Sequence, residues 1–150
     1  MRVVIQRVTD AQVVIGGTTA GRIGKGLLIL LGVGTDDTKE DVEWRVKKIA
    51  ALRIFDDDNG VMNRSVMDVD GEVMVVSQFT LMASYKNGNR PSWIRAARHE
   101  HAIPMYEMFV TTLQKTYKLH VETGVFGAEM QVGLVNDGPV TICMDTKNKE

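Results

Sequence analysis

The sequence predicts an α+β fold, in which a mostly antiparallel sheet packs against two helices. Several short segments with alternating or continuous apolar residues predict strands. Two longer segments instead repeat apolar residues at spacings of three and four, and strands lie between them. No repeat, linker or low-complexity segment interrupts the 150 residues, so we expect one domain over residues 1–150.

The first 34 residues are predicted to form strands. Val3 and Ile5, and then Val13 and Ile15, are spaced as residues on one face of a strand, and Gly16-Gly17 marks a turn. The apolar run 27–31 lies between two glycines, which is typical of a strand buried on both faces. Four later segments are also predicted strands: 72–81, about 119–122, 129–135 and 139–144.

Two helices are predicted, at residues 39–52 and at roughly 104–117. The first has Thr38 as a hydroxyl N-cap, with the carboxylate of Asp41 three residues later. In both segments the apolar residues fall on one helical face, which we expect to pack on the sheet.

Three polar segments are predicted loops, turns or ends. Residues 83–92 contain a glycine and a proline and form a predicted loop. Residues 56–60 resemble part of a calcium loop but lack carboxylates at its first and last ligand positions, so a hairpin turn through Asn59-Gly60 is favoured. The polar tail 145–150 is expected to be frayed.

The composition is that of a soluble globular protein, with 44% apolar and 25% charged residues. The single Cys143 suits a reducing compartment. The first residues do not form a signal peptide, and no run approaches the roughly 20 apolar residues that span a bilayer. We therefore expect a cytoplasmic protein without a membrane segment. A net charge of −1 means that any RNA contact must come from a local basic patch.

Several familiar site chemistries are excluded. His99 and His101 have no visible third partner, which favours a solvated helix start over a metal site. Gly32-Val33-Gly34 follows a strand, yet Asp37 stands where the third glycine of a dinucleotide-binding motif belongs. No P-loop or Gly-x-Ser-x-Gly motif occurs, and Cys143 has no neighbouring histidine. We expect no metal and no cofactor.

Two short segments carry the functional hypothesis. Along the predicted strand 72–81, Ser77 and Phe79 share one face, and Gln78 and Thr80 share the other. Spacing alone is consistent with an ordinary core strand that emerges at a sheet edge. Gly138-Pro139 lies between two apolar segments, as an ordinary turn would, and the sequence does not give its isomer.

Taken together, Ser77–Leu81 and Asn136–Thr141 resemble the paired signature of the D-aminoacyl-tRNA deacylases. The similarity covers nearly the whole chain, in order and without gaps. Its further segments are Met1–Thr9, Gly24–Gly34, Lys86–Ser92 and Phe126–Val132. The loop 83–86 is the least similar part.

The resemblance implies a homodimer with a β-barrel-like fold and sites at the subunit interface. The family cleaves the ester that joins a D-amino acid, or glycine, to the 3′-terminal adenosine of tRNA. Gly138-Pro139 would be cis and would enter the partner subunit's pocket, where its carbonyls hold the amino group and leave no space for an L side chain. The catalytic residues would be Ser77, Gln78, Phe79 and Thr80, and contacts to the substrate or its RNA would come from Met130, Lys86 and Arg90.

An aminoacyl ester is an activated acyl group, so positioning and oxyanion donors can suffice for its hydrolysis; one such donor contributes about 3–4 kcal/mol. We expect the donors to be backbone N–H groups near Phe79 and Thr80, with Ser77 and Gln78 positioning the substrate. Thr80 as a direct nucleophile stays open, although no base is visible near it in the sequence.

The densest basic stretch spans Tyr85 to Arg98 and includes Trp93. It suits phosphate contact with stacking, and it suits a solvated loop equally well. Two other classes of protein also stay open. One is an RNA-binding module without catalysis, and the other is a small-molecule hydrolase that ignores tRNA. Incubation with D-Tyr-tRNA and L-Tyr-tRNA separates all three.

Overall fold

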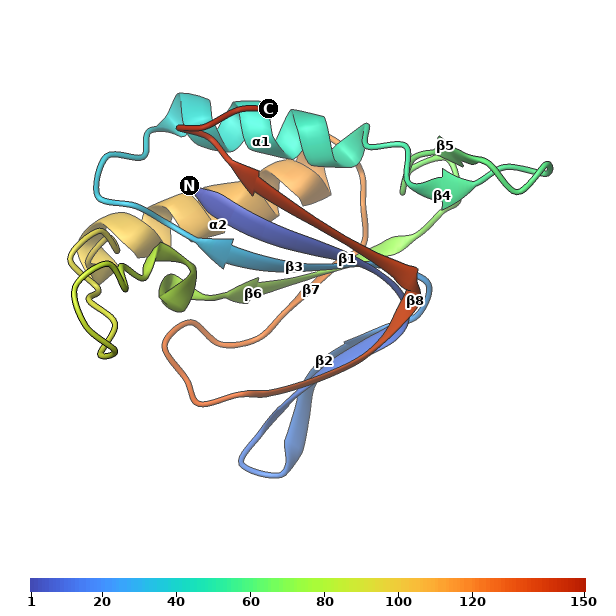
Figure 1. The fold of residues 1–150 in the computed structure, drawn as a ribbon. Helices are drawn as coiled ribbons and strands as arrows, with labels where there is room; N and C mark the ends of the chain where they lie inside the picture. Colours follow the sequence, from blue (N-terminus) through green and yellow to red (C-terminus); the bar gives the residue numbers. More distant parts are fainter.

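The computed structural model describes residues 1–150, and its two helices lie far apart in the sequence (Figure 1). A short 3-10 helix, η1, follows the sixth strand. The elements in chain order are β1 (Arg2–Ile15), β2 (Thr18–Ile23), β3 (Gly26–Gly32), α1 (Lys39–Ala50), β4 (Phe55–Asp56), β5 (Met62–Arg64), β6 (Glu72–Ser77), η1 (Phe79–Met82), α2 (His99–Lys115), β7 (Val121–Thr123) and β8 (Gln131–Asp145). Neither α1 nor α2 is long and apolar enough to cross a membrane.

Strand β1 is the centre of the sheet. Its first part, Arg2–Val8, pairs with β3, and its last part, Ala11–Ile15, pairs with β2. Strand β8 pairs with the other edge of β1, and all three pairings are antiparallel. The pairs β3–β6 and β6–β7 are parallel. The predicted mostly antiparallel sheet with two helices is therefore confirmed.

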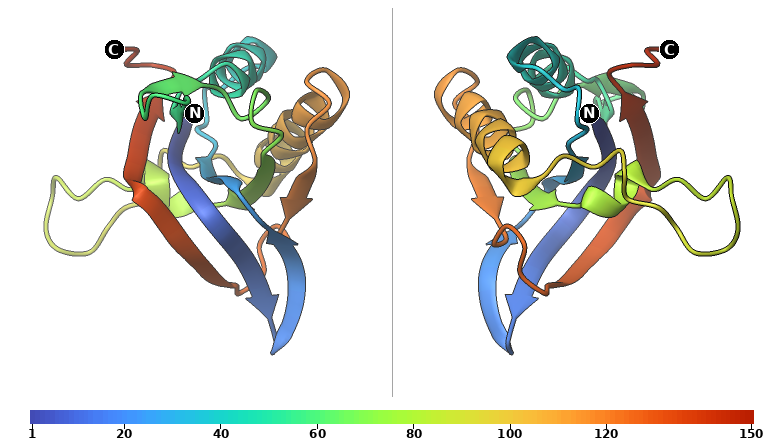
Figure 2. Two further views of the ribbon diagram at one scale, coloured as in Figure 1. Left: turned by 90° about the vertical axis from the view of Figure 1, so that its right-hand side faces the viewer. Right: turned by 90° about the vertical axis from the view of Figure 1, so that its left-hand side faces the viewer.

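The sheet curls into a nearly closed, barrel-like form (Figure 2). Strand β2 contacts both β6 and β7, although it pairs with neither of them. The two helices lie together on one face of the sheet, and the larger hydrophobic core lies between them and the strands (Figure 1). The barrel-like form implied by the family resemblance is thus present in this chain.

Strand β3 is buried on both faces, as its uninterrupted apolar sequence predicts. Leu27, Ile29 and Leu31 belong to the larger core under the helices. Leu28 lies in a second, smaller cluster with Met74 and Val76 of β6. Because alternate residues of a strand point to opposite faces, β3 and β6 each contribute to both clusters.

Local sequence signals set the start of α1 and the β4–β5 hairpin. The carboxylate of Asp41 accepts the backbone N–H of Thr38 at 2.9 Å, which forms the predicted capping box. In the hairpin, the Asp57 carboxylate accepts the N–H groups of Asn59 and Val61 at 2.9 and 3.1 Å. Gly60 has a φ of 73°, which favours glycine at this position. Both sequence predictions are confirmed.

The predicted strand 72–81 is wrong in its second half, because β6 ends at Ser77. The N–H of Gln78 still donates to Leu31 of β3, at 2.8 Å. The chain then turns into η1, where the N–H of Leu81 donates to the carbonyl of Gln78 at 3.2 Å. Phe79 and Thr80 therefore do not continue the two faces of the strand. The apolar sequence favours an extended strand here, and the turn is visible only in the structure.

Helix α2 begins at His99, five residues before the predicted start, and Pro104 lies inside it. The start depends on a tertiary contact, because the N–H of Ala97 donates to Val33, just beyond β3, at 2.9 Å. The predicted strands 129–135 and 139–144 form one strand, β8. Between the pairs Gln6–Thr141 and Val8–Asn136, residues 137–140 of β8 form an irregularity opposite Arg7.

The predicted fraying of the tail 145–150 is wrong for its first residues. Asp145 ends β8, and Thr146 is buried and donates its N–H to the Met1 carbonyl at 2.9 Å. The Lys147 ammonium donates to the Asp41 carboxylate at 2.9 Å. Burial alone would raise the pKa of Asp41, but hydrogen bonds from Lys147 and Thr38 hold that pKa below its usual value. The tail closes over the N-terminal end of β1.

A buried ion pair joins Met1 to the turn after β3. The Met1 ammonium group binds the carboxylate of Asp37, and both side chains have no exposed surface. The same carboxylate accepts the N–H of Gly34 at 2.6 Å, and Thr146 binds the Met1 ammonium at 2.8 Å. One carboxylate therefore fixes the turn after β3, the start of β1 and the end of β8.

We expect Asp37→Asn to lower the free energy of unfolding by about 3 kcal/mol or more, because it leaves a buried ammonium group without its counter-charge. Chemical denaturation of the variant and of the wild type measures the difference. Asp36→Asn is the matched control, because Asp36 is exposed and is the preceding residue in the same turn. A decrease below about 1 kcal/mol for Asp37→Asn would contradict the central role of this ion pair.

Candidate functional site

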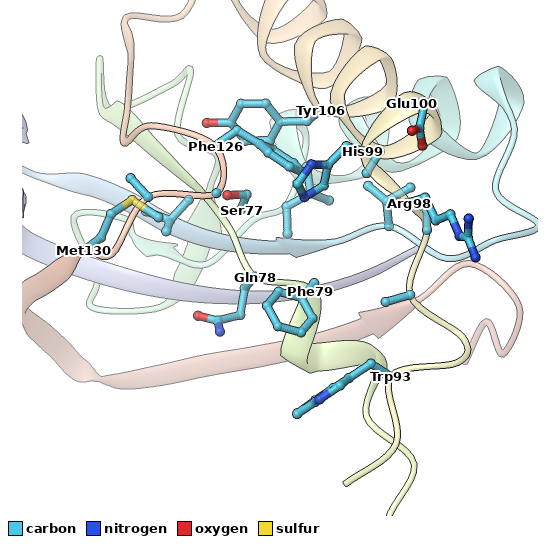
Figure 3. Close-up of a pocket in the computed structure, with 18 of the residues that line it drawn as sticks. Ser77, Gln78, Phe79, Trp93, Arg98, His99, Glu100, Tyr106, Phe126 and Met130 are labelled. Atoms are coloured by element: carbon cyan, nitrogen blue, oxygen red, sulfur yellow. The ribbon is translucent and has the colours of Figure 1, made fainter.

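A cavity of about 710 Å³ lies where β6 ends, α2 begins and β8 starts (Figure 3). Nineteen residues line it, and thirteen of them are hydrophobic. Ser77, Gln78 and Phe79 contribute from the end of β6 and the start of η1, and Met130 contributes from the segment before β8. A largely apolar cavity with a few polar groups is typical of a small-molecule site.

The four residues of the predicted catalytic segment occupy different positions. Ser77 and Gln78 are half-buried in the cavity wall, and Phe79 lines the cavity with 55% of its surface exposed. Thr80 is half-buried and does not line the cavity. Its hydroxyl accepts a hydrogen bond from the Gln78 side-chain amide. An amide cannot remove a proton from a hydroxyl, so this contact does not activate Thr80 as a nucleophile.

Phe79 and Thr80 each have a backbone N–H group without an acceptor inside η1. They are the first two residues of η1, and the first N–H groups of a helix have no acceptor inside it. The next N–H, that of Leu81, already donates to Gln78. Two adjacent N–H donors beside an apolar cavity are suited to bind a negatively charged oxygen.

Aromatic rings line two sides of the cavity. The Phe79 ring contacts Trp93 edge-to-face, with ring centroids 5.2 Å apart. On the other side, Phe126 contacts both His99 and Tyr106, with centroids 5.6 Å apart in each pair. In Figure 3, Phe126, His99 and Tyr106 lie together, and Phe79 and Trp93 lie on another side of the cavity. Flat aromatic surfaces of this kind bind a planar ring by stacking.

Tyr106 is the most buried titratable residue of the cavity, and its hydroxyl donates to the carbonyl of Val75 at 3.2 Å. Burial raises the pKa of this phenol, so Tyr106 is neutral at physiological pH. Arg98, His99 and Glu100, at the start of α2, also line the cavity. Beside the N–H groups of Phe79 and Thr80, the cavity therefore also has charged side chains, at the start of α2.

Of the three residues predicted to bind the substrate or its RNA, one lies in the cavity and two lie in a loop outside it. Met130 lines the cavity, and its sulfur packs so closely on Gly124 that a Cβ added there would lie 2.3 Å from it. Lys86 and Arg90 are exposed in the loop between η1 and α2 and do not line the cavity. The structure thus brings Met130 together with Ser77, Gln78 and Phe79, and leaves the two basic residues outside.

Gly138 and Pro139 are exposed in the irregular part of β8 and do not line the cavity of their own chain. Their peptide bond is cis, as the family resemblance implies. The Arg7 guanidinium donates to the carbonyl of Asp137 at 2.9 Å and to that of Ile54 at 2.8 Å. Gly138 has a φ of 135°, and an added Cβ would lie 2.8 Å from the Val140 side chain, so only glycine fits.

Sequence patterns do not group Trp93, His99, Tyr106 and Phe126 in one cavity. They come from the end of a loop, from α2 and from the segment before β8, so no spacing rule connects them. The one available signal was the aromatic and histidine content of these segments. His99 and His101 do not act together, because His99 contacts Phe126 and His101 binds the carbonyl of Asp37 at 2.8 Å.

Comparison with known proteins gives consistent results. The family model for D-Tyr-tRNA(Tyr) deacylase matches residues 4–145. D-aminoacyl-tRNA deacylases of Flavobacterium johnsoniae and Akkermansia muciniphila are 57% and 59% identical over 150 residues, and the alignments cover all of both chains.

Two solved structures share the fold. One, named c-Myc DNA Unwinding Element Binding Protein, has a TM-score of 0.92 and 44% identity over 97% of this chain and 98% of its own. The other, a probable eukaryotic D-amino acid tRNA deacylase, has a TM-score of 0.82 and 15% identity over 95% of this chain and 97% of its own. The family model matches residues 4–145, and the Flavobacterium johnsoniae relative matches over the full length of both chains. The chain therefore belongs to the D-Tyr-tRNA(Tyr) deacylase family and is a hydrolase.

Proposed function

We propose that this enzyme hydrolyses the ester that joins a D-amino acid, or glycine, to the 3′-terminal adenosine of tRNA. The observation that carries the proposal is the pair of N–H groups of Phe79 and Thr80 at the edge of an aromatic cavity. The ester carbonyl would lie against these donors, and the adenosine would lie among the aromatic rings. The curated relatives are named for an activity on D-aminoacyl-tRNA, which agrees with this assignment.

The reaction needs one water molecule and no redox step. Water adds to the ester carbonyl carbon, and the negative charge that develops on the carbonyl oxygen is stabilised by the two N–H groups. The bond from that carbon to the ribose oxygen then breaks, and the oxygen takes up a proton. The products are the free amino acid and tRNA with an intact 3′ end. Ser77 and Gln78 would position the acyl group.

The adenosine would be held on the opposite side of the cavity. Met130 and Phe126 line it there, and a thioether beside an aromatic ring is a favourable surface for a purine. This placement assigns Met130 to substrate binding. It also separates the two parts of the substrate, with the acyl group at η1 and the base at the start of β8.

We also assign Gly138 and Pro139 to the selection of D over L substrates, in the cavity of a second copy of the chain. Two observations support a dimer. Both residues are exposed and lie outside their own cavity, and β8 has an unpaired edge and an exposed apolar side chain, Val135. A rigid backbone that fills the space of an L side chain would reject L substrates sterically. Glycine has no side chain and would be accepted.

One observation favours a second candidate function, nucleic-acid binding without catalysis. The solved structure with 44% identity is named as a DNA-binding protein. Hydrolysis assays with D-Tyr-tRNA and L-Tyr-tRNA separate the two functions. Release of D-tyrosine alone supports the deacylase, and binding without release supports the alternative.

We expect Thr80→Ala to keep most of the single-turnover rate on D-Tyr-tRNA, because the substitution leaves the backbone donor in place. A nucleophile would behave differently, since its removal costs several orders of magnitude. Thr111→Ala, an exposed threonine on α2, is the matched control. A decrease of about a thousandfold or more, in a folded variant that still binds tRNA, would assign the nucleophile to Thr80.

We expect Phe79→Pro to lower the rate by about a hundred- to a thousandfold relative to Phe79→Ala, because proline alone removes the N–H donor. Both substitutions remove the ring, so their comparison isolates the donor. Proline is tolerated at the first position of a helix, and Phe79 is the first residue of η1. Circular dichroism and denaturation confirm that both variants fold. Equal rates for the two would exclude this N–H from the mechanism.

We expect the active species to be a dimer whose sites combine two chains. Phe79→Pro damages the cavity, and Gly138→Ala distorts the partner's backbone, whose carbonyls would hold the substrate's amino group, so each variant alone should be nearly inactive. An equal mixture, exchanged by dilution and reconcentration, should regain about a quarter of wild-type activity, because half of the dimers are mixed and one of their two sites is intact. A mixture that stays inactive, or a monomer with full activity in light scattering, would contradict the shared site.

A further inference from the structure

A closed loop projects from the molecule beside the cavity. Its two ends are joined by a pair of hydrogen bonds between Ser84 and Ser92, at 2.9 and 2.8 Å. The seven residues between them contact little else, and Figure 2 shows the loop standing away from the sheet. We name these residues the finger; all are exposed, and they are Tyr85, Lys86, Asn87, Gly88, Asn89, Arg90 and Pro91.

The base of the finger is attached to the proposed oxyanion donors. The N–H of Ala83 donates to the carbonyl of Thr80 at 3.1 Å, and the guanidinium of Arg95 donates to the carbonyl of Ala83 at 3.1 Å. On the other side, Trp93 follows the finger directly and contacts the ring of Phe79. The two ends of the finger thus meet η1 through Ala83 and Trp93. A molecule that binds the finger would therefore lie next to the cavity.

The finger is positively charged although the whole chain has a net charge of −1. No aspartate or glutamate occurs between Glu72 and Glu100, and this stretch contains four cations, at positions 86, 90, 95 and 98. Lys86 and Arg90 form no ion pair, in contrast to Arg2, which is bound to Asp145 at 2.8 Å. Arg95 is occupied by the Ala83 carbonyl. Two unpaired cations therefore lie in an exposed loop whose base is closed by hydrogen bonds.

We propose that Lys86 and Arg90 bind the phosphate backbone of the tRNA acceptor stem while the 3′-terminal adenosine occupies the cavity. The inference rests on the proposed function, because that function places an aminoacylated RNA end in the cavity. The stem is joined covalently to this end, so its phosphates are the polyanion nearest the cavity mouth. Lysine and arginine contacts to phosphate supply affinity without reading sequence. Tyr85, 80% exposed, offers a ring for stacking beside them.

The test compares two double variants, Lys86→Gln/Arg90→Gln and Lys39→Gln/Lys47→Gln. The second is the matched control, because Lys39 and Lys47 are exposed on α1 and form no ion pair. Two substrates are used, D-Tyr-tRNA and the 3′-D-tyrosyl ester of adenosine, which has no stem. Binding of a fluorescent acceptor-stem minihelix is measured in parallel by anisotropy over a range of salt concentrations.

For the finger variant we expect kcat/KM on D-Tyr-tRNA and minihelix affinity to fall by roughly ten- to a hundredfold near 0.1 M salt. The slope of log affinity against log salt should shrink by about two units, or one for each phosphate that is no longer bound. Hydrolysis of the adenosine ester should not change, and the control variant should match the wild type in every measurement. An equal decrease for minihelices of different sequence would agree with phosphate binding.

Three results would overturn the proposal. One is a finger variant that binds the minihelix with wild-type affinity and salt slope. Another is an equal decrease on the adenosine ester, which would place the residues in the cavity mechanism. The third is a change in oligomeric state, which would make the finger an interface between copies of this chain. Failure of the proposed function differs from all three, because the wild type would then hydrolyse neither ester while minihelix binding stays measurable.

Discussion

Strand β1 is paired along both of its edges, and this double pairing sets the shape of the sheet. Strand β3 occupies one edge for the first part of β1 and β2 occupies it for the last part, while β8 follows the other edge. The exchange of partners accompanies the curl that brings β2 against β6 and β7. The curled sheet places the end of β6 and the start of β8 on one cavity, beside the first turn of α2.

The elements that the sequence predicts well are those with local causes. The apolar run 27–31 is buried on both faces, Thr38 and Asp41 cap α1, and Asn59-Gly60 turns the β4–β5 hairpin. The errors have tertiary causes. The strand from residue 72 stops at Ser77, where the chain turns into η1, and the start of α2 follows a hydrogen bond between Ala97 and Val33. Neither feature has a counterpart in the pattern of nearby residues.

The candidate site is predictable only in part, for the same reason. Periodicity alone would have left Ser77 and Gln78 as polar residues in an ordinary strand, and only the family resemblance selected them. The cavity adds Trp93, Tyr106 and Phe126, which lie far from that segment in sequence. Its proposed donors are backbone N–H groups. Every residue except proline has such a group, so the residue type does not reveal which of them act as donors. What places them is the turn into η1 after Gln78, and the sequence pattern favoured an extended strand there.

The N–H groups of Phe79 and Thr80 affect how the rate of the reaction would depend on pH. Side chains that act as acids or bases make a reaction depend on their own protonation, and enzymes that use them show this as limbs in a pH profile. A peptide N–H does not titrate in the physiological range, and the Tyr106 phenol nearby has its pKa raised by burial. The protonation of these two donors would therefore stay constant over this range. A reaction that relies on them would respond to pH chiefly through the protonation of the substrate's ammonium group and of the attacking water.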